Sequence, residues 1–314
     1  MKKTIIYTLA LAFSVLFAVS CDQDPLSPES VIKDSTVEKN AFDEWLEAYF
    51  LKPYNIQFKY RFELNESDKG YWNVPADIDA AIIYAHLVKH LCIETYDEVA
   101  GEVFTRSYFP KMFFLIGTWE YRNNDSFVLG TAEAGKKIML SGVNYLPLYI
   151  DYYSGPELED ILNDYYIKTI HHEFTHILNQ VKAYSESFAQ VSPNTYVGDA
   201  CFDTDEYNRG RGYITAYAQS EHSEDFAELL SEYITHSAEW WQQQLAEAKA
   251  ETAEVRKSNP DAPYGNVIIS SKIDIVRDYM QDAWDIDIDE LRDVVLRRFG
   301  EVADGQVDLH TIDL

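Results

Sequence analysis

Three of the chain's eight histidines fall within six positions, in the segment HHEFTH at residues 171–176. The surrounding residues, from Gly155 to about Val181, repeat apolar side chains at helical spacing and predict one long helix. His172 and His176 are four residues apart, so their directions on a helix differ by only about 40°. The apolar stripe of this helix points in nearly the opposite direction. The fold must therefore place the two histidines on a polar face that borders a cleft.

These two histidines have the spacing of metal ligands. Imidazoles one helical turn apart can share a tetrahedral zinc ion, and Glu173 projects to one side, where it can reach a water molecule on the metal. Residues His172 to His176 thus form the HExxH pattern, with Glu173 as the general base. A solvated helix face with surface histidines is the alternative. His171 points elsewhere on the helix, so we expect it at the surface or beside the ligands.

A third zinc ligand is sought downstream, because a catalytic zinc ion usually takes three protein ligands. Residues 217–234, YAQSEHSEDFAELLSEYI, predict a helix that is capped by Ser223. On it, Glu224 and Glu228 share a face turned away from the apolar stripe. Two helices with apolar backs against one core can direct their polar faces into one cleft. The candidates are Glu224 and Glu228, followed by Asp225, Asp203 and Asp205.

This segment resembles the corresponding part of gluzincin-like peptidases, which bind zinc through two histidines and a glutamate. Matched residue by residue, the resemblance implies that Glu224 is the third ligand and that Glu228 holds a ligand histidine. It also implies that Tyr217, seven residues before Glu224, donates to the oxyanion that develops during catalysis. The metzincin pattern does not fit, because Lys182 stands where its third histidine would fall and Asn179 where it needs glycine.

The first 20 residues have the plan of a secretory signal peptide. Lys2 and Lys3 precede an apolar run that is too short for a comfortable bilayer span of about 20 residues. The small residues before Cys21 resemble the lipobox of bacterial lipoproteins, which implies cleavage at this point and a lipid on the Cys21 thiol. An ordinary signal peptide with an incidental cysteine is the alternative. Polar residues 21–38 predict a flexible tether, and 39–314 a single catalytic domain.

With the lipobox included, the chain resembles zinc metallohydrolase lipoproteins of Bacteroidetes. This resemblance covers the signal, the HEFTH helix and the EDFAE helix. It implies export and lipid anchoring at the outer membrane of a Gram-negative bacterium, and association with an outer-membrane nutrient-import complex. It also implies one zinc ion and a peptide or protein substrate.

Composition narrows the choice of partners and supports a large core. The net charge of −27 repels nucleic acid, because phosphate binding needs clustered Lys and Arg. The 23 Tyr, 16 Phe and 6 Trp can fill a substantial core. If Cys21 carries lipid, Cys92 and Cys201 remain, either as buried thiols or as a disulfide.

The pattern along the chain predicts an α+β fold, in which a small mixed sheet and the HExxH helix (39–182) precede a mainly helical part (183–314). Expected helices span 39–52, 75–96, 155–181 and 223–250, and Pro53 is expected to end the first of them. After a break at 260–265, the last 45 or so residues are expected to be mainly helical. Expected strands span 55–64, 112–116 and 137–140, and a loop region runs through 193–215. The strand at 137–140 is expected at the sheet edge, where an extended peptide can bind.

The residues therefore predict a zincin-like metallopeptidase that cleaves peptide bonds with a metal-activated water. An accessory binding lipoprotein for nutrient capture, whose zinc site is structural or inactive, is the alternative from another class. The presence of Glu173 favours the enzyme, because a structural zinc site needs no base. Hydrolysis of a different amide or ester, such as a modified glycan, is a third possibility without a visible second constellation of catalytic residues.

Overall fold

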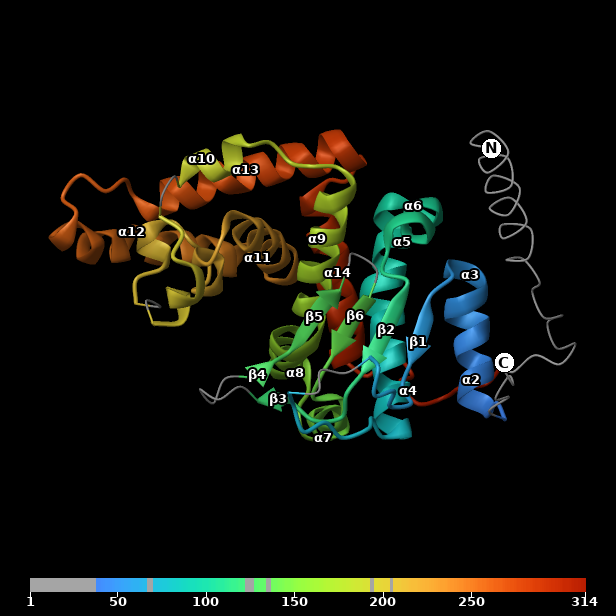
Figure 1. The fold of residues 1–314 in the computed structure, drawn as a ribbon. Helices are drawn as coiled ribbons and strands as arrows, with labels where there is room; N and C mark the ends of the chain where they lie inside the picture. The colour runs from blue at the N-terminus through green and yellow to red at the C-terminus, as the bar shows by residue number, and fades with distance from the viewer. Residues whose placement is uncertain (1–37, 67–69, 122–126, 134–136, 193–194, 204–205) are drawn as a thin grey trace, which may run out of the picture. The chain divides into compact units, whose positions relative to one another are not determined.

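A computed structural model describes residues 38–66, 70–121, 127–133, 137–192, 195–203 and 206–314 (Figure 1). The predicted signal peptide and Cys21 lie outside these residues. Asn40–Leu314 forms one compact unit, which is mostly helical with a small sheet, so the predicted α+β class is confirmed. No helix among the described residues is long and apolar enough to cross a membrane.

Four strands form the main sheet, in the order β1 (Gln57–Lys59), β2 (Met112–Leu115), β6 (Lys137–Leu140) and β5 (Gly130–Glu133). The first three are parallel, and β5 pairs antiparallel with β6. A separate hairpin joins β3 (Glu120–Tyr121) to β4 (Phe127–Val128). The expectation that β6 lies at the edge is wrong, because the residues before it fold back as β5 and cover that side.

The sheet packs on both faces, as the alternation of its side chains requires. Phe113, Leu115, Ile138 and Leu140 point into the main core with the helices. Phe114, Ile116 and Met139 form a smaller cluster on the opposite face, covered by Phe62 and Tyr71. Of the predicted strand 55–64, only β1 is regular, although Ile56, Phe58 and Tyr60 are all buried as the pattern indicates.

The first helical segment runs through α2 (Ala41–Leu46), a π-helical turn (Glu47–Leu51) and α3 (Lys52–Tyr54). The expectation that Pro53 ends this helix is wrong. The helix continues to Tyr54, because the wide π turn leaves room for the proline ring. The helix ends at Asn55, which adopts a left-handed conformation (φ 56°).

The predicted helix 75–96 begins three residues later and continues further. It comprises α4 (Ile78–Leu87), a π turn (Val88–Ile93) and α5 (Glu94–Ala100), and the short α6 (Glu102–Tyr108) follows. Cys92 is buried in the π turn, and no disulfide joins it to Cys201. The disulfide alternative is therefore wrong.

The predicted helix 155–181 is present along its whole length. After α7 (Leu146–Tyr152), it runs through α8 (Gly155–Leu162), a π turn called η4 (Asn163–Ile167) and α9 (Lys168–Val181). Pro156 lies in its first turn, where a missing N–H costs nothing. Lys182 is extended and ends α9 at the point where the metzincin pattern would place a third histidine.

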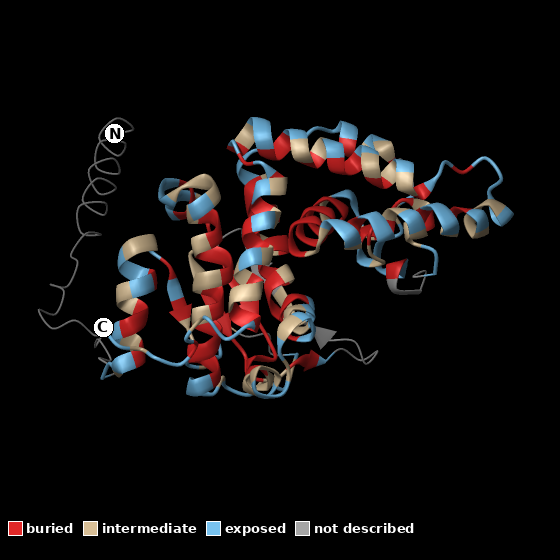
Figure 2. Ribbon diagram, turned by 180° about the vertical axis from the view of Figure 1, so that it is seen from behind, coloured by how far each residue is buried: buried red, intermediate tan, exposed pale blue. Residues whose placement is uncertain are grey.

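The C-terminal part contains α10 (Ser187–Val191), α11 (His222–Thr235), α12 (Ala238–Ser258), α13 (Gly265–Trp284) and α14 (Ile288–Ala303). The prediction of one helix over 223–250 is wrong, because Ser237 caps the Trp240 N–H and starts a new helix. Ser223 is not a cap either, since its hydroxyl donates to Glu221, the residue before the helix. Figure 2 shows α11 buried over most of its length.

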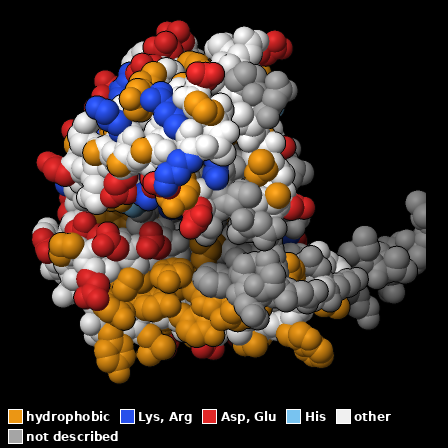
Figure 3. Space-filling model, turned by 90° about the vertical axis from the view of Figure 1, so that its left-hand side faces the viewer, with side chains coloured by type: hydrophobic (Ala, Val, Ile, Leu, Met, Phe, Trp, Pro, Cys, Tyr) orange, Lys and Arg blue, Asp and Glu red, His pale blue; other side chains and the backbone are white. Residues whose placement is uncertain are grey.

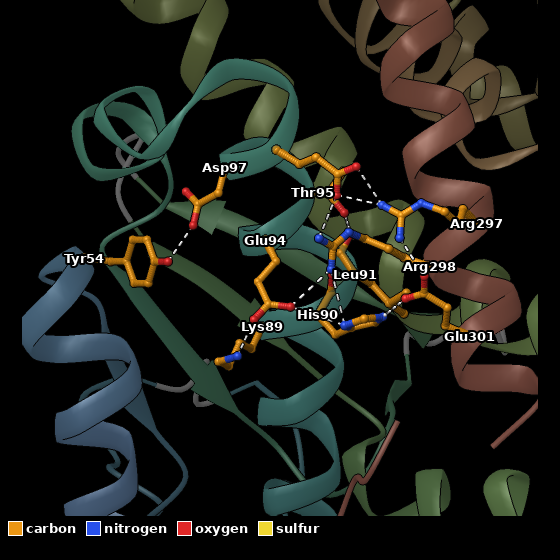
Figure 4. A network of polar contacts seen from close by, with 11 residues as sticks. Tyr54, Lys89, His90, Leu91, Glu94, Thr95, Asp97, Arg297, Arg298 and Glu301 are labelled. Atoms are coloured by element: carbon orange, nitrogen blue, oxygen red, sulfur yellow. Dashed lines mark hydrogen bonds and ion pairs between the residues drawn. The ribbon is translucent and has the colours of Figure 1, made fainter. Parts of the chain in front are cut away.

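A polar network fastens α14 to α5 and the π turn before it (Figure 4). Arg298 reaches Glu94 at 3.1 Å and Glu98 at 2.9 Å, and the Nε2 atom of His90 lies 2.9 Å from Glu301. Burial opposes ionisation of Glu94, but contacts from His90 and Lys89 outweigh it and lower its pKa to about 2. The network therefore holds α14 against α5. Helix α5 in turn contacts α9, where the Tyr96 hydroxyl meets His171.

Candidate metal centre

Two histidines and a glutamate converge where α9 packs against α11. The Nε2 atoms of His172 and His176 lie 3.1 Å apart. Glu224 Oε2 lies 3.0 Å from the first and 3.2 Å from the second. Within the described part of the chain, these three form the one group of His, Cys, Asp or Glu side chains able to share a metal ion.

The spacing of these three atoms fits a zinc ion. Tetrahedral bonds of 2.0–2.1 Å place neighbouring ligand atoms about 3.3–3.4 Å apart, close to the separations seen here. The chemistry of the donors also fits, since imidazole nitrogen and carboxylate oxygen are ordinary zinc ligands. A set of three protein ligands leaves one position open, as catalytic zinc sites do, whereas structural sites are usually closed by four.

Glu228 orients one of the ligands from behind. Its Oε1 lies 2.8 Å from Nδ1 of His172, on the side of the ring away from the other ligands. Its Oε2 accepts a hydrogen bond of 2.7 Å from the Thr215 hydroxyl. A proton on Nδ1 leaves the lone pair on Nε2, so Glu228 directs the metal-binding atom of His172 toward His176 and Glu224.

Lys168 balances the charge of this carboxylate. Its Nζ lies 3.6 Å from Glu228 and 2.8 Å from Glu232. Burial alone would lower the pKa of Lys168, but the two carboxylates outweigh it and raise that pKa. Glu232 in turn contacts His236 at 3.2 Å. A chain of polar contacts therefore runs from Glu228 through Lys168 to Glu232, along the interface of α9 and α11.

The ligands influence each other's protonation. Burial disfavours the charged form of Glu224, but His172 and His176 outweigh it and lower the pKa of Glu224 to about 2. Burial also opposes a charge on His172, yet Glu224 and Glu228 raise its pKa to about 10. The Glu224 carboxylate is therefore ionised at neutral pH, and metal binding must displace a proton from His172.

Glu173 and Tyr217 lie beside the three ligands. The Tyr217 ring is 6.1 Å from the His172 ring, and this tyrosine is 40% exposed at the mouth of the site. Burial and then the carboxylates of Glu224 and Glu173 raise the pKa of Tyr217, so it keeps its phenolic proton. Glu173 directly follows His172 on α9, is partly exposed, and its charge contributes to the raised pKa of both His172 and Tyr217.

Other candidates from the sequence lie elsewhere. His171 is buried rather than at the surface, and its Nδ1 lies 3.1 Å from the Tyr96 hydroxyl. Asp225 is no ligand, because it forms a fully buried ion pair of 2.6 Å with Lys272. The side chains of Asp203 and Asp205 are outside the part that the structure describes.

Comparison with known proteins identifies the family of this chain. The model of a family described as "Putative zinc-binding metallo-peptidase" matches residues 35–289. The chain belongs to this family. A crystal structure at 2.10 Å of a protein from Bacteroides caccae ATCC 43185, which carries the same description, is 36% identical to it. The match has a TM-score of 0.70 and covers 90% of this chain and 100% of the other. No curated protein is similar enough in sequence for a comparison.

Lys168 and Thr215 belong to the site but were not identified from the sequence of this metallopeptidase-family chain. Lys168 lies four residues before His172 on the same helix face, so helical periodicity could have indicated it. Thr215 gave no such signal, because it lies in an irregular segment and its contact with Glu228 depends on how that segment folds over α11.

We expect Glu228→Ala to weaken zinc binding by about 10- to 100-fold, because His172 loses the group that orients its ring. Competition with a chromophoric chelator measures this affinity. Glu239→Gln, at an exposed position of α12, is the control and should bind zinc like the wild type. An unchanged affinity in Glu228→Ala would show that Glu228 does not orient the ligand.

Proposed function

We propose that the protein is a zinc-dependent peptidase. The observation that carries this proposal is a set of three converging ligands among the residues that the structure describes, with Glu173 directly after His172 on the same helix. His172, His176 and Glu224 would hold the ion. A structural site has no use for an open position or for a base beside it.

The residues around the ligands have distinct roles in peptide hydrolysis. Zinc would supply Lewis acidity, which polarises the carbonyl and makes water more acidic. Glu173 takes the proton from the attacking water and passes it to the leaving amine, as general base and then general acid. Tyr217 keeps its phenolic proton and donates to the carbonyl oxygen as negative charge develops there. Glu228 and Thr215 hold His172 in position throughout.

An extended substrate would bind along β5. This strand is the outer strand of the described sheet on the side of α9, and β6, which the sequence favoured, is covered. A Cβ atom built on Gly130 would approach Thr169 Cγ2 to 2.8 Å, so β5 crosses α9 one turn before Glu173. Backbone pairing with β5 would therefore bring a peptide past the ligands.

The test is hydrolysis of labelled casein and of a peptide library, before and after removal of zinc by a chelator. We expect activity to vanish on chelation and to return when zinc is added in stoichiometric amount. If the zinc-loaded protein cleaves neither substrate but binds peptides or glycans tightly, the accessory binding function replaces the peptidase.

We also propose, from the sequence alone, that Cys21 carries a lipid and that the protein is exported and anchored at the outer membrane. An association with a nutrient-import complex belongs to the same proposal. Labelling with a radioactive fatty acid tests it, because Cys21→Ser should abolish incorporation.

A further inference from the structure

A group of aromatic side chains lies at the surface near the N-terminal end of α9. We call it the tyrosine surface, and it consists of Tyr121, Tyr145, Tyr149, Tyr153 and Tyr165, which lie over the buried Trp119. Tyr149 stacks on Tyr165, with ring centroids 5.9 Å apart and planes inclined by 11°. Trp119 stacks on Tyr145 at 5.7 Å and contacts Tyr165 at the same distance. Tyr149 also contacts Tyr153, at 6.3 Å. These ring contacts connect the 3-10 turn η3 (Val143–Tyr145), α7 with the residue after it, and η4, and Tyr121 of β3 lies near Tyr149.

These rings are held in place from below but remain accessible. Tyr166, next to Tyr165, is fully buried, contacts Trp119 and donates to the carbonyl of Gly142 at 3.0 Å. Above it, Tyr145, Tyr149 and Tyr165 are half-buried, and Tyr121 is 59% exposed. Such a rigid, partly exposed apolar surface is typical of a binding site.

The side of the molecule that carries β3 and α7 is rich in apolar side chains. Figure 3 shows apolar side chains gathered on the lower half of this side of the molecule. A hollow separates them from an upper half that carries most of the Lys and Arg side chains in this view. The lower half of this side is where Figure 1 places β3 and α7, which carry part of the tyrosine surface.

One helix connects the tyrosine surface to the zinc ligands. Tyr165 lies in η4, which continues directly into α9, and precedes His172 by seven residues. Seven helical residues correspond to about 10 Å along the axis. Strand β5 crosses α9 between them, at Thr169, and β3 of the tyrosine surface pairs with β4, which directly precedes β5. A peptide on β5 would therefore extend from the ligands toward the tyrosine surface.

We propose that the tyrosine surface is a subsite for bulky apolar side chains of a polypeptide substrate, above all aromatic ones. The distance of about 10 Å corresponds to about three residues of extended chain at about 3.3 Å each. The preferred side chain thus lies about three residues from the cleaved bond, on one side of it. This inference rests on the proposed peptidase function and names the substrate that the site selects.

The test is cleavage-site profiling with a library of tryptic peptides, analysed by mass spectrometry. Wild type should enrich Phe, Tyr, Trp or Leu at about the third residue on one side of the bond, by about 10-fold over Ser. The double variant Tyr149→Ser/Tyr165→Ser should lose this enrichment. Tyr264→Ser, which removes a tyrosine of 43% exposure before α13, should keep it.

A second variant keeps the test decisive if the double variant does not fold. Tyr121 is the most exposed member of the tyrosine surface, so Tyr121→Ser should fold and still reduce the enrichment. Cleavage without enrichment in wild type, or enrichment that survives in these variants, would overturn the subsite while the peptidase function stands. A wild type that cleaves no peptide in a zinc-dependent way would overturn the peptidase function, and the subsite with it.

Discussion

Replacement of Glu173 by Gln is expected to leave zinc in the protein and to lower kcat by about 10²- to 10⁴-fold. Glutamine has nearly the same size and shape as glutamate but cannot accept the proton of the attacking water. Glu173 is not among the three converging ligands, so the metal should remain bound. Zinc content by elemental analysis and kcat on a cleaved library peptide measure the two effects separately.

The control for this substitution is Glu239→Gln, which makes the same chemical change at an exposed position of α12. It should retain wild-type kcat. A Glu173→Gln protein with zinc bound and activity close to wild type would show that another group takes the proton.

Replacement of Glu224 by Ala is expected to abolish stoichiometric zinc binding. The carboxylate lies within 3.2 Å of both histidine Nε2 atoms, and its loss leaves only two protein ligands. The drop in affinity should exceed the roughly 10- to 100-fold effect expected for Glu228→Ala, because Glu228 acts only through His172. Zinc content after dialysis against a weak chelator measures the loss.

A matched control lies three residues away on the same helix end. Glu221 is exposed and is not one of the converging ligands, so Glu221→Ala should bind one zinc per chain. If Glu224→Ala also retains one tightly bound zinc, then another side chain is the third ligand and the assignment fails.

Helical periodicity predicted the parts of the site that lie on regular helices. His172 and His176, and likewise Glu224 and Glu228, are pairs at spacing four, so their shared faces follow from geometry alone. The apolar stripes of the same helices predicted how α9 and α11 turn these faces toward each other. Periodicity left both Glu224 and Glu228 as candidates for the third ligand, and the resemblance to gluzincin-like peptidases favoured Glu224.

Features that depend on contacts between distant segments could not be predicted in the same way. The spacing shows that His171 points away from His172, but not that Tyr96, 75 residues earlier, covers it. The order of the sheet is another example, because the sequence of β5, GTAE, contains none of the large apolar residues that indicated β2 and β6. The break between α11 and α12 was missed because a cap at Ser237 interrupts an otherwise helical pattern.

The central claim is that one zinc ion is shared by two imidazoles of α9 and one carboxylate of α11. A crystal of the zinc-loaded protein, with anomalous data collected on both sides of the zinc absorption edge, tests it directly. We predict a single strong peak about 2.0–2.1 Å from His172 Nε2, His176 Nε2 and a Glu224 oxygen. Zinc bound elsewhere, or a site in which these three side chains point apart, would contradict the account.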